Sequence, residues 1–512
     1  MLVKVFGSAI HGVDATTITV EVSVDKGIKF FLVGLPDSAV KESQQRVRSA
    51  LAYCGLKMPR KQITVNMAPA DIRKEGSAYD LPIAIGLLAA SEQLKSDELT
   101  HTIIMGELSL DGSLQPITGA LPMAIQAVKE GFKSIILPMT NAREAAIVEG
   151  IEIYGAKNLE EVVRHFNDGE HLPLIVTNPK EAFERAYTLS SVDFSEVKGQ
   201  ENVKRALEIA AAGGHNVILI GPPGAGKSML AKRMATILPP MTMEEALETT
   251  KIHSVSGILP PGQALVARRP FRSPHHSISN AALVGGGSYP QPGEISLAHH
   301  GILFLDELPE FQRSVLEVMR QPMEDREVTI SRAKHTVTYP ASFMLFASMN
   351  PCPCGYHNHP SRDCTCGPGQ VDRYLNKISG PLLDRIDLHV EVTPVEFKEI
   401  SNDMPSEKSE SVRQRVLNAR TIQQLRFTDH PALHCNAEMG SKLLRSVCKL
   451  DESGRSMLES AMKRMNLSAR AYDRILKVAR TIADLEASEE VQPRHLAEAI
   501  QYRSLDRGDW GK

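Results

Sequence analysis

The sequence lacks the features that define secreted, membrane-spanning and disulfide-rich proteins. Its 512 residues include only seven cysteines, one tryptophan and 5% aromatic residues. Seven cysteines cannot staple a chain of this length, which excludes a disulfide scaffold. No apolar run approaches the roughly 18–20 residues that a membrane-spanning helix requires. The first residues are not followed by the apolar segment of a secretory signal. We therefore expect a cytoplasmic protein.

An excess of either charge is also missing. Lysine and arginine number 58, aspartate and glutamate 61, and the formal net charge is −3. A globally basic surface is thus excluded, so a nucleic-acid site would have to be a local patch or be assembled by oligomerisation. The content of 42% hydrophobic and 23% charged residues is typical of a globular protein. At about 150 residues per domain, the length suggests about three domains.

Periodicity and composition divide the chain into three folded parts and a linker. Residues 166–192 have the composition of a linker, and residues 396–512 show a helical pattern. We predict a mixed α/β domain over residues 1–165, the linker over 166–192, an α/β core over 193–395 with a cysteine-rich loop at 352–366, and a small helical domain over 396–512.

The first domain has readable local signals. Alternating apolar residues predict a strand at 18–24, which turns at 25–27 into a second strand at 28–33, so we expect these two strands to form a hairpin. Asp37 or Ser38 is predicted to cap the helix that follows. A further apolar helix is predicted over residues 80–94.

A phosphate-binding loop is the strongest motif in the sequence. A buried-strand pattern leads into it and a helical pattern follows it, which is the context that this motif requires. Converging backbone N–H groups and the helix N-terminus suit phosphate oxygens. Lys227 would neutralise phosphate charge and Ser228 would ligate Mg²⁺. The loop consists of Gly221, Pro222, Pro223, Gly224, Ala225, Gly226, Lys227 and Ser228.

A second motif places two carboxylates after an apolar strand. Residues 301–305 have a buried-strand pattern and lead directly into Asp306 and Glu307. Asp306 suits the Mg²⁺ shell, and Glu307 suits polarisation of the attacking water. Together with the phosphate-binding loop, this pair predicts ATP hydrolysis that depends on Mg²⁺.

These two motifs resemble those of AAA+ ATPases of the magnesium-chelatase-like branch. Over essentially its whole length the sequence is similar to the competence protein ComM (YifB-like) family. The resemblance implies a P-loop AAA+ α/β core, a C-terminal helical lid and a ring, which is a homo-hexamer in the family. It also implies roles for further residues: Val197 and Gly199 in the segment that cups the adenine, Asn350 as sensor 1, Arg385 as an arginine finger that reaches a neighbouring subunit, and Arg470 as sensor 2.

The N-terminal domain resembles the Lon-protease-like (ribosomal-protein-S5-like) α+β fold. In Lon a serine and a downstream lysine form the catalytic dyad. In this sequence Ser77 is displaced by one position from the serine of that motif, and Leu121 stands about where the lysine is expected. An alkyl side chain cannot deprotonate a serine, so we interpret the domain as a non-proteolytic relative that serves binding or assembly.

Two basic segments are candidates for contact with DNA. Residues 327–339 are predicted to form a hairpin, with Arg332, Lys334 and His335 at or beside its tip. The hairpin resembles the pre-sensor-1 hairpin of AAA+ helicases, whose tips point into the pore; the alternative is a structural hairpin that caps the sheet. The segment 267–276 is basic and histidine-rich, which suits either phosphate contact or a solvated loop.

Four cysteines form a C-x-C-x9-C-x-C cluster directly after Asn350. Four thiolates can make a closed tetrahedral Zn²⁺ site, although knuckles usually have C-x2-C spacing. A transient disulfide is the alternative, and a reducing cytosol disfavours it. The cluster consists of Cys352, Cys354, Cys364 and Cys366.

The resemblance implies an ATP- and Mg²⁺-dependent DNA motor with helicase and branch-migration activity in homologous recombination and natural transformation. Single-stranded or branched DNA would be its partner. The alternatives are a magnesium-chelatase motor subunit and a protein-remodelling ATPase.

Overall fold

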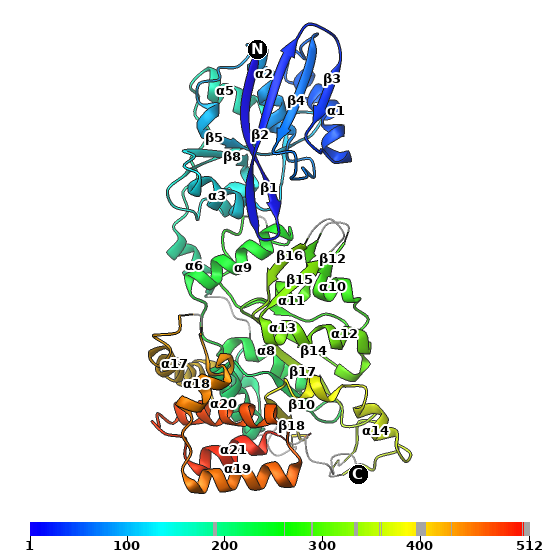
Figure 1. Cartoon of the computed structure of the whole chain (residues 1–512), viewed down its shortest axis with the longest axis vertical. Coiled ribbons are helices and arrows are strands. Elements are labelled where there is room, and N and C mark those ends of the chain that lie inside the picture. The colour runs from blue at the N-terminus through cyan, green and yellow to red at the C-terminus, as the bar shows by residue number, and fades with distance from the viewer. Residues whose placement is uncertain are drawn as a thin grey trace. The chain divides into compact units, whose positions relative to one another are not determined.

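A computed structural model describes residues 1–187, 192–260, 262–287, 290–331, 336–357, 359, 361–395, 406–431, 433–503 and 505. The chain forms two compact units (Figure 1). The first unit comprises Met1–Thr188 together with Thr242–Arg268, and the second comprises Leu189–Met241 together with Arg269–Lys512. None of the helices in the described parts of the chain is long and apolar enough to cross a membrane.

A mixed seven-stranded sheet forms the centre of the first unit. Its strand order is β3-β4-β2-β1-β5-β8-β9, with β1–β2 and β2–β4 antiparallel and the other pairs parallel. The expected α+β class of this part is confirmed. Its strands are β1 (Leu2–His11), β2 (Asp14–Asp25), β3 (Phe30–Val33), β4 (Gln62–Ala68), β5 (Thr102–Ile104), β8 (Ser134–Pro138) and β9 (Glu152–Ala156), and a short pair, β6 (Glu107–Leu108) and β7 (Leu114–Gln115), lies beside them.

The predicted hairpin between the second and third strands is wrong. Strand β4 lies between β2 and β3, pairing antiparallel with β2 and parallel with β3. The reason is that β3 is a short edge strand, and its best hydrogen-bonding partner comes from a distant part of the sequence. The hairpin that does form joins β1 and β2, whose register runs from Leu2 opposite Ser23 to His11 opposite Asp14.

The helices of the first unit begin where the sequence places capping residues. The Asp37 carboxylate accepts a hydrogen bond from the Val40 N–H (2.8 Å) and caps α1, as predicted. Helix α2 is buried along its whole length and ends at Ala90, four residues earlier than expected. The helices are α1 (Ser38–Tyr53), α2 (Asp80–Ala90), α3 (Ala120–Lys129), α4 (Met139–Ala145), α5 (Leu159–Asn167), α6 (Pro179–Tyr187) and α9 (Met243–Val255).

Helix α9 belongs to the first unit although it follows the phosphate-binding loop in sequence. The buried Glu144 carboxylate accepts hydrogen bonds from the Leu121 N–H (2.9 Å) and from the Ser254 hydroxyl of α9. The Gly119 N–H donates to the Ser254 carbonyl (3.2 Å). The chain therefore crosses between the two units three times. The predicted linker region also contains α6, and the domain boundaries drawn from the sequence stay a prediction.

The second unit contains a five-stranded parallel sheet in the order β11-β14-β17-β10-β18. Its central strands are wholly buried, which matches the continuous apolar runs of the sequence. The strands are β10 (Val217–Ile220), β11 (Phe271–Arg272), β14 (Ile302–Leu305), β17 (Met344–Met349) and β18 (Leu388–Glu391), and two hairpins add β12 (Gly285–Gly286) with β13 (Gln291–Pro292) and β15 (Glu327–Ser331) with β16 (Thr336–Pro340).

The C-terminal helices share one hydrophobic core with this sheet. Val412 and Val416 of α17 and Ile475 of α20 lie in the same buried cluster as Val217 and Leu219 of β10. The expected helical C-terminal region is confirmed. The helices of the second unit are α7 (Glu201–Gly213), α8 (Lys227–Ile237), α10 (Asn280–Val284), α11 (Glu294–Leu297), α12 (Arg313–Val318), α13 (Arg320–Asp325), α14 (Gln370–Leu375), α15 (Gly380–Leu383), α17 (Ser409–Arg426), α18 (Ser441–Val447), α19 (Glu452–Met465), α20 (Ala469–Leu485) and α21 (Pro493–Gln501).

The ion pair between Arg46 and Asp80 gives a stability prediction for the first unit. The Asp80 carboxylate is fully buried, and Arg46 donates to both of its oxygens at 2.6 and 2.9 Å. Burial raises the pKa of Asp80 although Arg46 opposes that shift. Arg46→Met leaves a buried carboxyl without its partner, so we expect a loss of about 3 kcal/mol in the stability of this unit.

Amide hydrogen exchange in α2 measures this loss, which corresponds to exchange faster by roughly 100-fold. Lys4→Met is the control, because Lys4 is 55% exposed in its 3.5 Å ion pair with Glu21, and such a surface pair contributes less than about 1 kcal/mol. Equal exchange rates in the two variants would contradict the prediction.

Candidate functional site

The register of three parallel strands brings the predicted nucleotide-binding residues to one edge of the sheet. Ile220 of β10 lies opposite Met349 of β17, and Leu305 of β14 lies opposite Ala347 of β17. All three strands therefore end at the same edge. The residues that follow them are the phosphate-binding loop, the Asp306–Glu307 pair and Asn350.

The phosphate-binding loop has the backbone that its glycines permit. Gly224 and Gly226 have φ angles of 79° and 86°, which side chains disfavour. Helix α8 begins at Lys227, and the Lys227 ammonium donates to the carbonyls of Gly221 (2.7 Å) and Pro222 (3.0 Å) and to the Asn350 side-chain oxygen (3.1 Å). Burial lowers the pKa of Lys227, and the nearby Asp306 carboxylate opposes that shift. The structure thus brings together the loop, its lysine and Asn350.

The residues proposed to hold Mg²⁺ are in direct contact. The Ser228 hydroxyl donates to one Asp306 oxygen at 2.8 Å. The other Asp306 oxygen accepts from the Ser348 hydroxyl and from the Glu307 N–H (3.1 Å). A hydroxyl and a carboxylate are oxygen ligands of the kind that Mg²⁺ prefers, so the donor set fits this ion.

Ser348 contacts the proposed Mg²⁺ ligand Asp306 but was not predicted from the sequence as a site residue. This residue is fully buried near the end of the otherwise apolar strand β17, and its hydroxyl fixes the orientation of Asp306. A hydroxyl in an otherwise apolar strand is the signal that could have identified it, because a buried polar group requires a partner.

Glu307 stands at the mouth of the site. Its backbone is left-handed (φ 54°), its side chain is 57% exposed, and one carboxylate oxygen lies 3.8 Å from Nδ1 of His276. His276 ends the basic segment 267–276. The arginines of that segment have internal partners: Arg269 donates to the carbonyls of Pro239 and His300, and Arg272 pairs with Glu294. These contacts of Arg269 and Arg272 hold part of the segment against the rest of the unit, so it is not a wholly solvated loop.

A cavity of about 400 Å³ joins these groups. It is lined by Pro223, Gly224, Ala225, Gly226, Lys227, Ser228, Met229, Asp306, Glu307, Ser348, Met349 and Asn350. Val197 and Gly199 do not line it. They belong to a neighbouring segment, whose Gln200 side chain donates to the carbonyls of Ala225 (3.0 Å) and Thr393 (3.1 Å) and so connects the segment to the loop.

Arg385 lies at the opposite edge of the sheet from the cavity, where the parallel strands β10 and β18 begin. It precedes β18, and its carbonyl accepts from the Asn216 side chain (3.2 Å) at the start of β10. The length of β10, about 13 Å for four residues, therefore separates this backbone from the phosphate-binding loop. The Arg385 guanidinium is buried, pairs with Glu324 (2.8 Å) and donates to the Pro381 carbonyl (2.6 Å).

Arg470 lies near the Arg385 segment rather than beside Lys227 in the chain's own cavity. It is an exposed residue at the start of α20, and Ser468, the N-cap of that helix, lies 3.4 Å from the Asp384 carboxylate. Arg385, the predicted finger, and Arg470, the predicted sensor 2, thus share one side of the unit.

The predicted hairpin over residues 327–339 forms as β15 and β16, in register from Glu327 opposite Pro340 to Ser331 opposite Thr336. Its inner face is buried, and the Tyr339 hydroxyl donates to the Pro290 carbonyl (2.7 Å). Arg332, Lys334 and His335 lie outside the described residues, so their placement stays a prediction.

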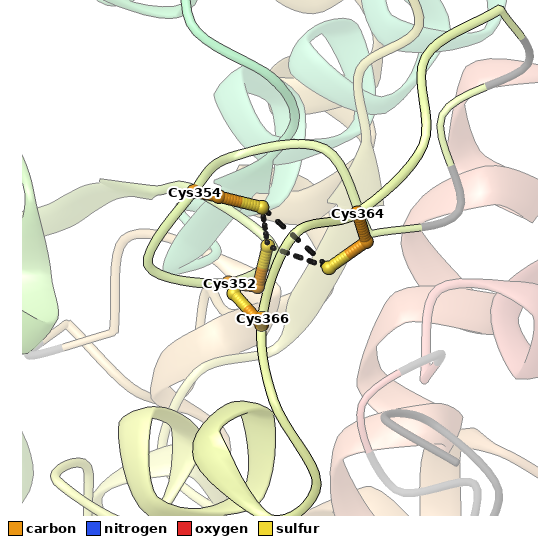
Figure 2. Close-up of side chains that lie close together, drawn as sticks. All are labelled: Cys352, Cys354, Cys364 and Cys366. Carbon is orange, nitrogen blue, oxygen red and sulfur yellow. Dashed lines mark hydrogen bonds between the residues drawn. The ribbon is translucent and has the colours of Figure 1, made fainter.

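The four clustered cysteines converge from two stretches of one loop (Figure 2). The Cys352 Sγ lies 3.3 Å from that of Cys354 and 3.7 Å from that of Cys364, and the last two are 3.5 Å apart. All four ligand atoms lie within 4.8 Å of one another. Tetrahedral Zn–S bonds of about 2.3 Å require sulfur atoms about 3.8 Å apart, so this thiol set fits Zn²⁺.

Burial and hydrogen bonds shift the pKa values of two thiols in this cluster in opposite directions. Burial raises the pKa of Cys352 to about 12. Burial also disfavours the thiolate of Cys354, but hydrogen bonds from the Tyr356 N–H and from Cys352 lower its pKa to about 5. A thiolate beside a thiol is a suitable starting state for metal binding, because the thiolate is the ligand.

Ser77 of the first unit is not paired with an amine. Its hydroxyl donates to the Glu107 carboxylate. Lys74, the lysine nearest in sequence, is buried, and its ammonium donates to the Pro69 carbonyl. Leu121 is buried in α3. These contacts do not make a serine–lysine dyad.

Three family models cover most of the chain. That for magnesium chelatase, subunit ChlI, matches residues 193–400, that for the subunit ChlI of Mg-chelatase matches 20–141, and the C-terminal model of the same subunit matches 406–503.

Known relatives extend over almost the whole chain. Competence protein ComM of Haemophilus influenzae is 46% identical over 99% of this chain and 98% of its own length. The uncharacterized protein YifB of Escherichia coli is 47% identical over 97% of this chain and 96% of its own length. Lon protease 2 of Bacillus subtilis is 32% identical over 25% of this chain and 22% of its own length. The chain therefore belongs to the ComM/YifB family of magnesium-chelatase-like AAA+ ATPases, which implies ATP, Mg²⁺ and ATPase activity.

Proposed function

We propose that the protein is a ring-forming, ATP- and Mg²⁺-dependent DNA motor that unwinds or branch-migrates DNA in homologous recombination and natural transformation. The observation that carries the proposal is that Arg385, the proposed arginine finger, lies far from the cavity of its own chain. Lys227, Asp306 and Asn350 meet at one edge of the sheet, whereas Arg385 lies at the other. A relative named for competence supports the DNA substrate.

Five residues of the cavity would have roles in hydrolysis. Lys227 would release its loop carbonyls and bind phosphate oxygens, and Ser228 and Asp306 would hold Mg²⁺, which neutralises phosphate charge when bound. Glu307 would orient and polarise the attacking water, and Asn350 would fix its position.

The arginines would complete the cavity of a neighbouring subunit. A finger stabilises charge in the transition state, and when it acts in trans, hydrolysis depends on assembly. Arg385 would exchange its pairing with Glu324 for the γ-phosphate of the neighbour. Arg470, on the same side, would act across the same interface. Such contacts between successive subunits would close a ring, for which we propose a homo-hexamer.

The hairpin tips would contact DNA inside that ring. Arg332, Lys334 and His335 follow β15 directly, and copies from every subunit would concentrate positive charge that the net charge of −3 conceals. We propose single-stranded or branched DNA as the partner and the cytoplasm as the location. The Lon-like domain would serve binding or assembly without proteolysis, since Ser77 contacts Glu107 rather than an amine.

The cysteine cluster would hold a structural Zn²⁺. The Sγ atoms of Cys352, Cys354 and Cys364 lie 3.3–3.7 Å apart, close to the spacing of a tetrahedral site, and that of Cys366 lies within 4.8 Å of them. A closed site of four protein ligands leaves no position for substrate, so the metal would stabilise the loop and take no part in hydrolysis.

A chelatase motor subunit is the second candidate, since the matching family models carry that description. Both candidates, and a protein-remodelling ATPase, would use the same cavity. They differ in what stimulates hydrolysis.

Removal of the Ser348 hydroxyl tests the Mg²⁺ site. Ser348→Ala frees Asp306 to rotate away from Ser228, so we expect the Mg²⁺ concentration for half-maximal ATPase to rise by about tenfold or more. A Mg²⁺ titration of ATP hydrolysis measures the shift. Ser446→Ala, on the exposed face of α18, is the control. An unchanged titration would remove Ser348 from the site.

Stimulation by DNA tests the substrate. We expect ATP hydrolysis to rise several-fold on addition of single-stranded or four-way-junction DNA, with Glu307→Gln as the inactive blank.

The double variant Arg332→Ala, Lys334→Ala tests the hairpin tip. It should reduce this stimulation, and it should lower the number of counterions released on DNA binding by about one to two, as measured from the salt dependence of binding. Lys463→Ala combined with Arg464→Ala, both exposed on α19, is the matched loss of two charges. Hydrolysis indifferent to every DNA would favour the chelatase or protein-remodelling candidates.

A further inference from the structure

We propose that the cysteine loop is a brace for the phosphate-binding loop, and that Gly355 is the positioning residue through which it acts. The inference rests on the proposed ATP site and on the proposed Zn²⁺ site. It adds a function to the cluster: the thiol-bound metal would set the geometry of phosphate binding from outside the cavity.

The two loops approach so closely that only a glycine fits between them. A Cβ atom built on Gly355 would lie 2.5 Å from Cδ and 2.8 Å from Cγ of Pro223. These distances are far below van der Waals contact, so the backbone of the cysteine loop lies directly against the proline ring. Pro223 in turn lines the nucleotide cavity.

The close contact comes from the centre of the cysteine cluster. Gly355 follows Cys354 directly, and its N–H donates to the Cys352 carbonyl (3.0 Å), which closes a tight turn. The His357 N–H donates to the Cys352 Sγ (3.3 Å). The backbone at Gly355 is left-handed (φ 84°), so a side chain there would be strained as well as blocked.

The same loop begins at the other wall of the cavity. Asn350, which accepts a hydrogen bond from Lys227, stands two residues before Cys352. The same loop thus reaches the cavity at two places, through Asn350 and through its contact with Pro223. Between β17 and α14 the described residues form neither helix nor strand, so regular hydrogen bonding does not fix this loop there. Cross-linking by the thiols would supply that rigidity.

Gly355→Ala separates the brace from the metal, because it keeps all four cysteines. We expect this variant to retain about one zinc per chain and to bind a fluorescent ATP analogue about tenfold more weakly. Gly369→Ala is the matched control: Gly369 also has a positive φ (72°), but a Cβ there meets nothing within 4 Å. The control should bind zinc and nucleotide as the wild type does.

A double-mutant cycle shows whether the two loops are coupled. Pro223→Ala removes the ring atoms Cγ and Cδ that a Cβ at position 355 would strike, so Gly355→Ala should weaken nucleotide binding less in the Pro223→Ala protein than in the wild type. Additive losses would contradict the contact. If Gly355→Ala does not fold, removal of zinc from the wild type with a zinc-selective chelator replaces it, and the same weakening of nucleotide binding is expected.

The outcomes distinguish the brace from the proposals that it rests on. Zinc retained with unchanged nucleotide affinity in Gly355→Ala overturns the brace and leaves the Zn²⁺ site intact. A wild type without zinc overturns the Zn²⁺ site and, with it, the brace by metal. A wild type that binds no nucleotide overturns the proposed ATP site. Weaker binding in Gly355→Ala with normal zinc and a normal control supports the brace.

Discussion

The parallel register of β14, β17 and β10 is the constraint on which the nucleotide site depends. Because Leu305, Met349 and Ile220 end at one edge, a lysine, a carboxylate and an amide from three distant parts of the sequence reach the same cavity. A slip of one residue would turn each strand's side chains to the other face of the sheet. The three strands are buried at every position, so close packing of their side chains on both faces of the sheet holds this register.

The same sheet explains why assembly and hydrolysis would be linked. Its opposite edge carries Arg385, held by Glu324, and the contact between Asp384 and Ser468 joins that edge to the start of α20. Two residues after Arg385, the buried Asp387 pairs with Arg474 of α20 at 2.8 Å. A movement of the C-terminal helices would therefore carry the Arg385 segment with it, and in the proposed assembly the neighbour's cavity would respond.

Contiguous motifs were predictable from the sequence, and contacts between distant residues were not. The phosphate-binding loop and the Asp306–Glu307 pair each follow an apolar run, so local order identifies them, whereas Asn350 was singled out by the resemblance to AAA+ ATPases. The partner of β3 was misjudged because β4, some thirty residues later, pairs with it. Ser348, the assignment of α9 to the first unit and the contact of Gly355 with Pro223 all depend on packing between segments, which periodicity does not encode.

Complementation between inactive subunits tests most directly whether the site is completed by a neighbour. Lys227→Ala removes the phosphate-binding lysine and Arg385→Ala removes the finger, so each homogeneous ring should be inactive. In an equimolar mixture, about one interface in four would combine the intact lysine of one subunit with the intact finger of the next. We therefore expect the mixture to regain about a quarter of the wild-type ATPase rate. A mixture as inactive as its components would contradict a finger that acts across the interface.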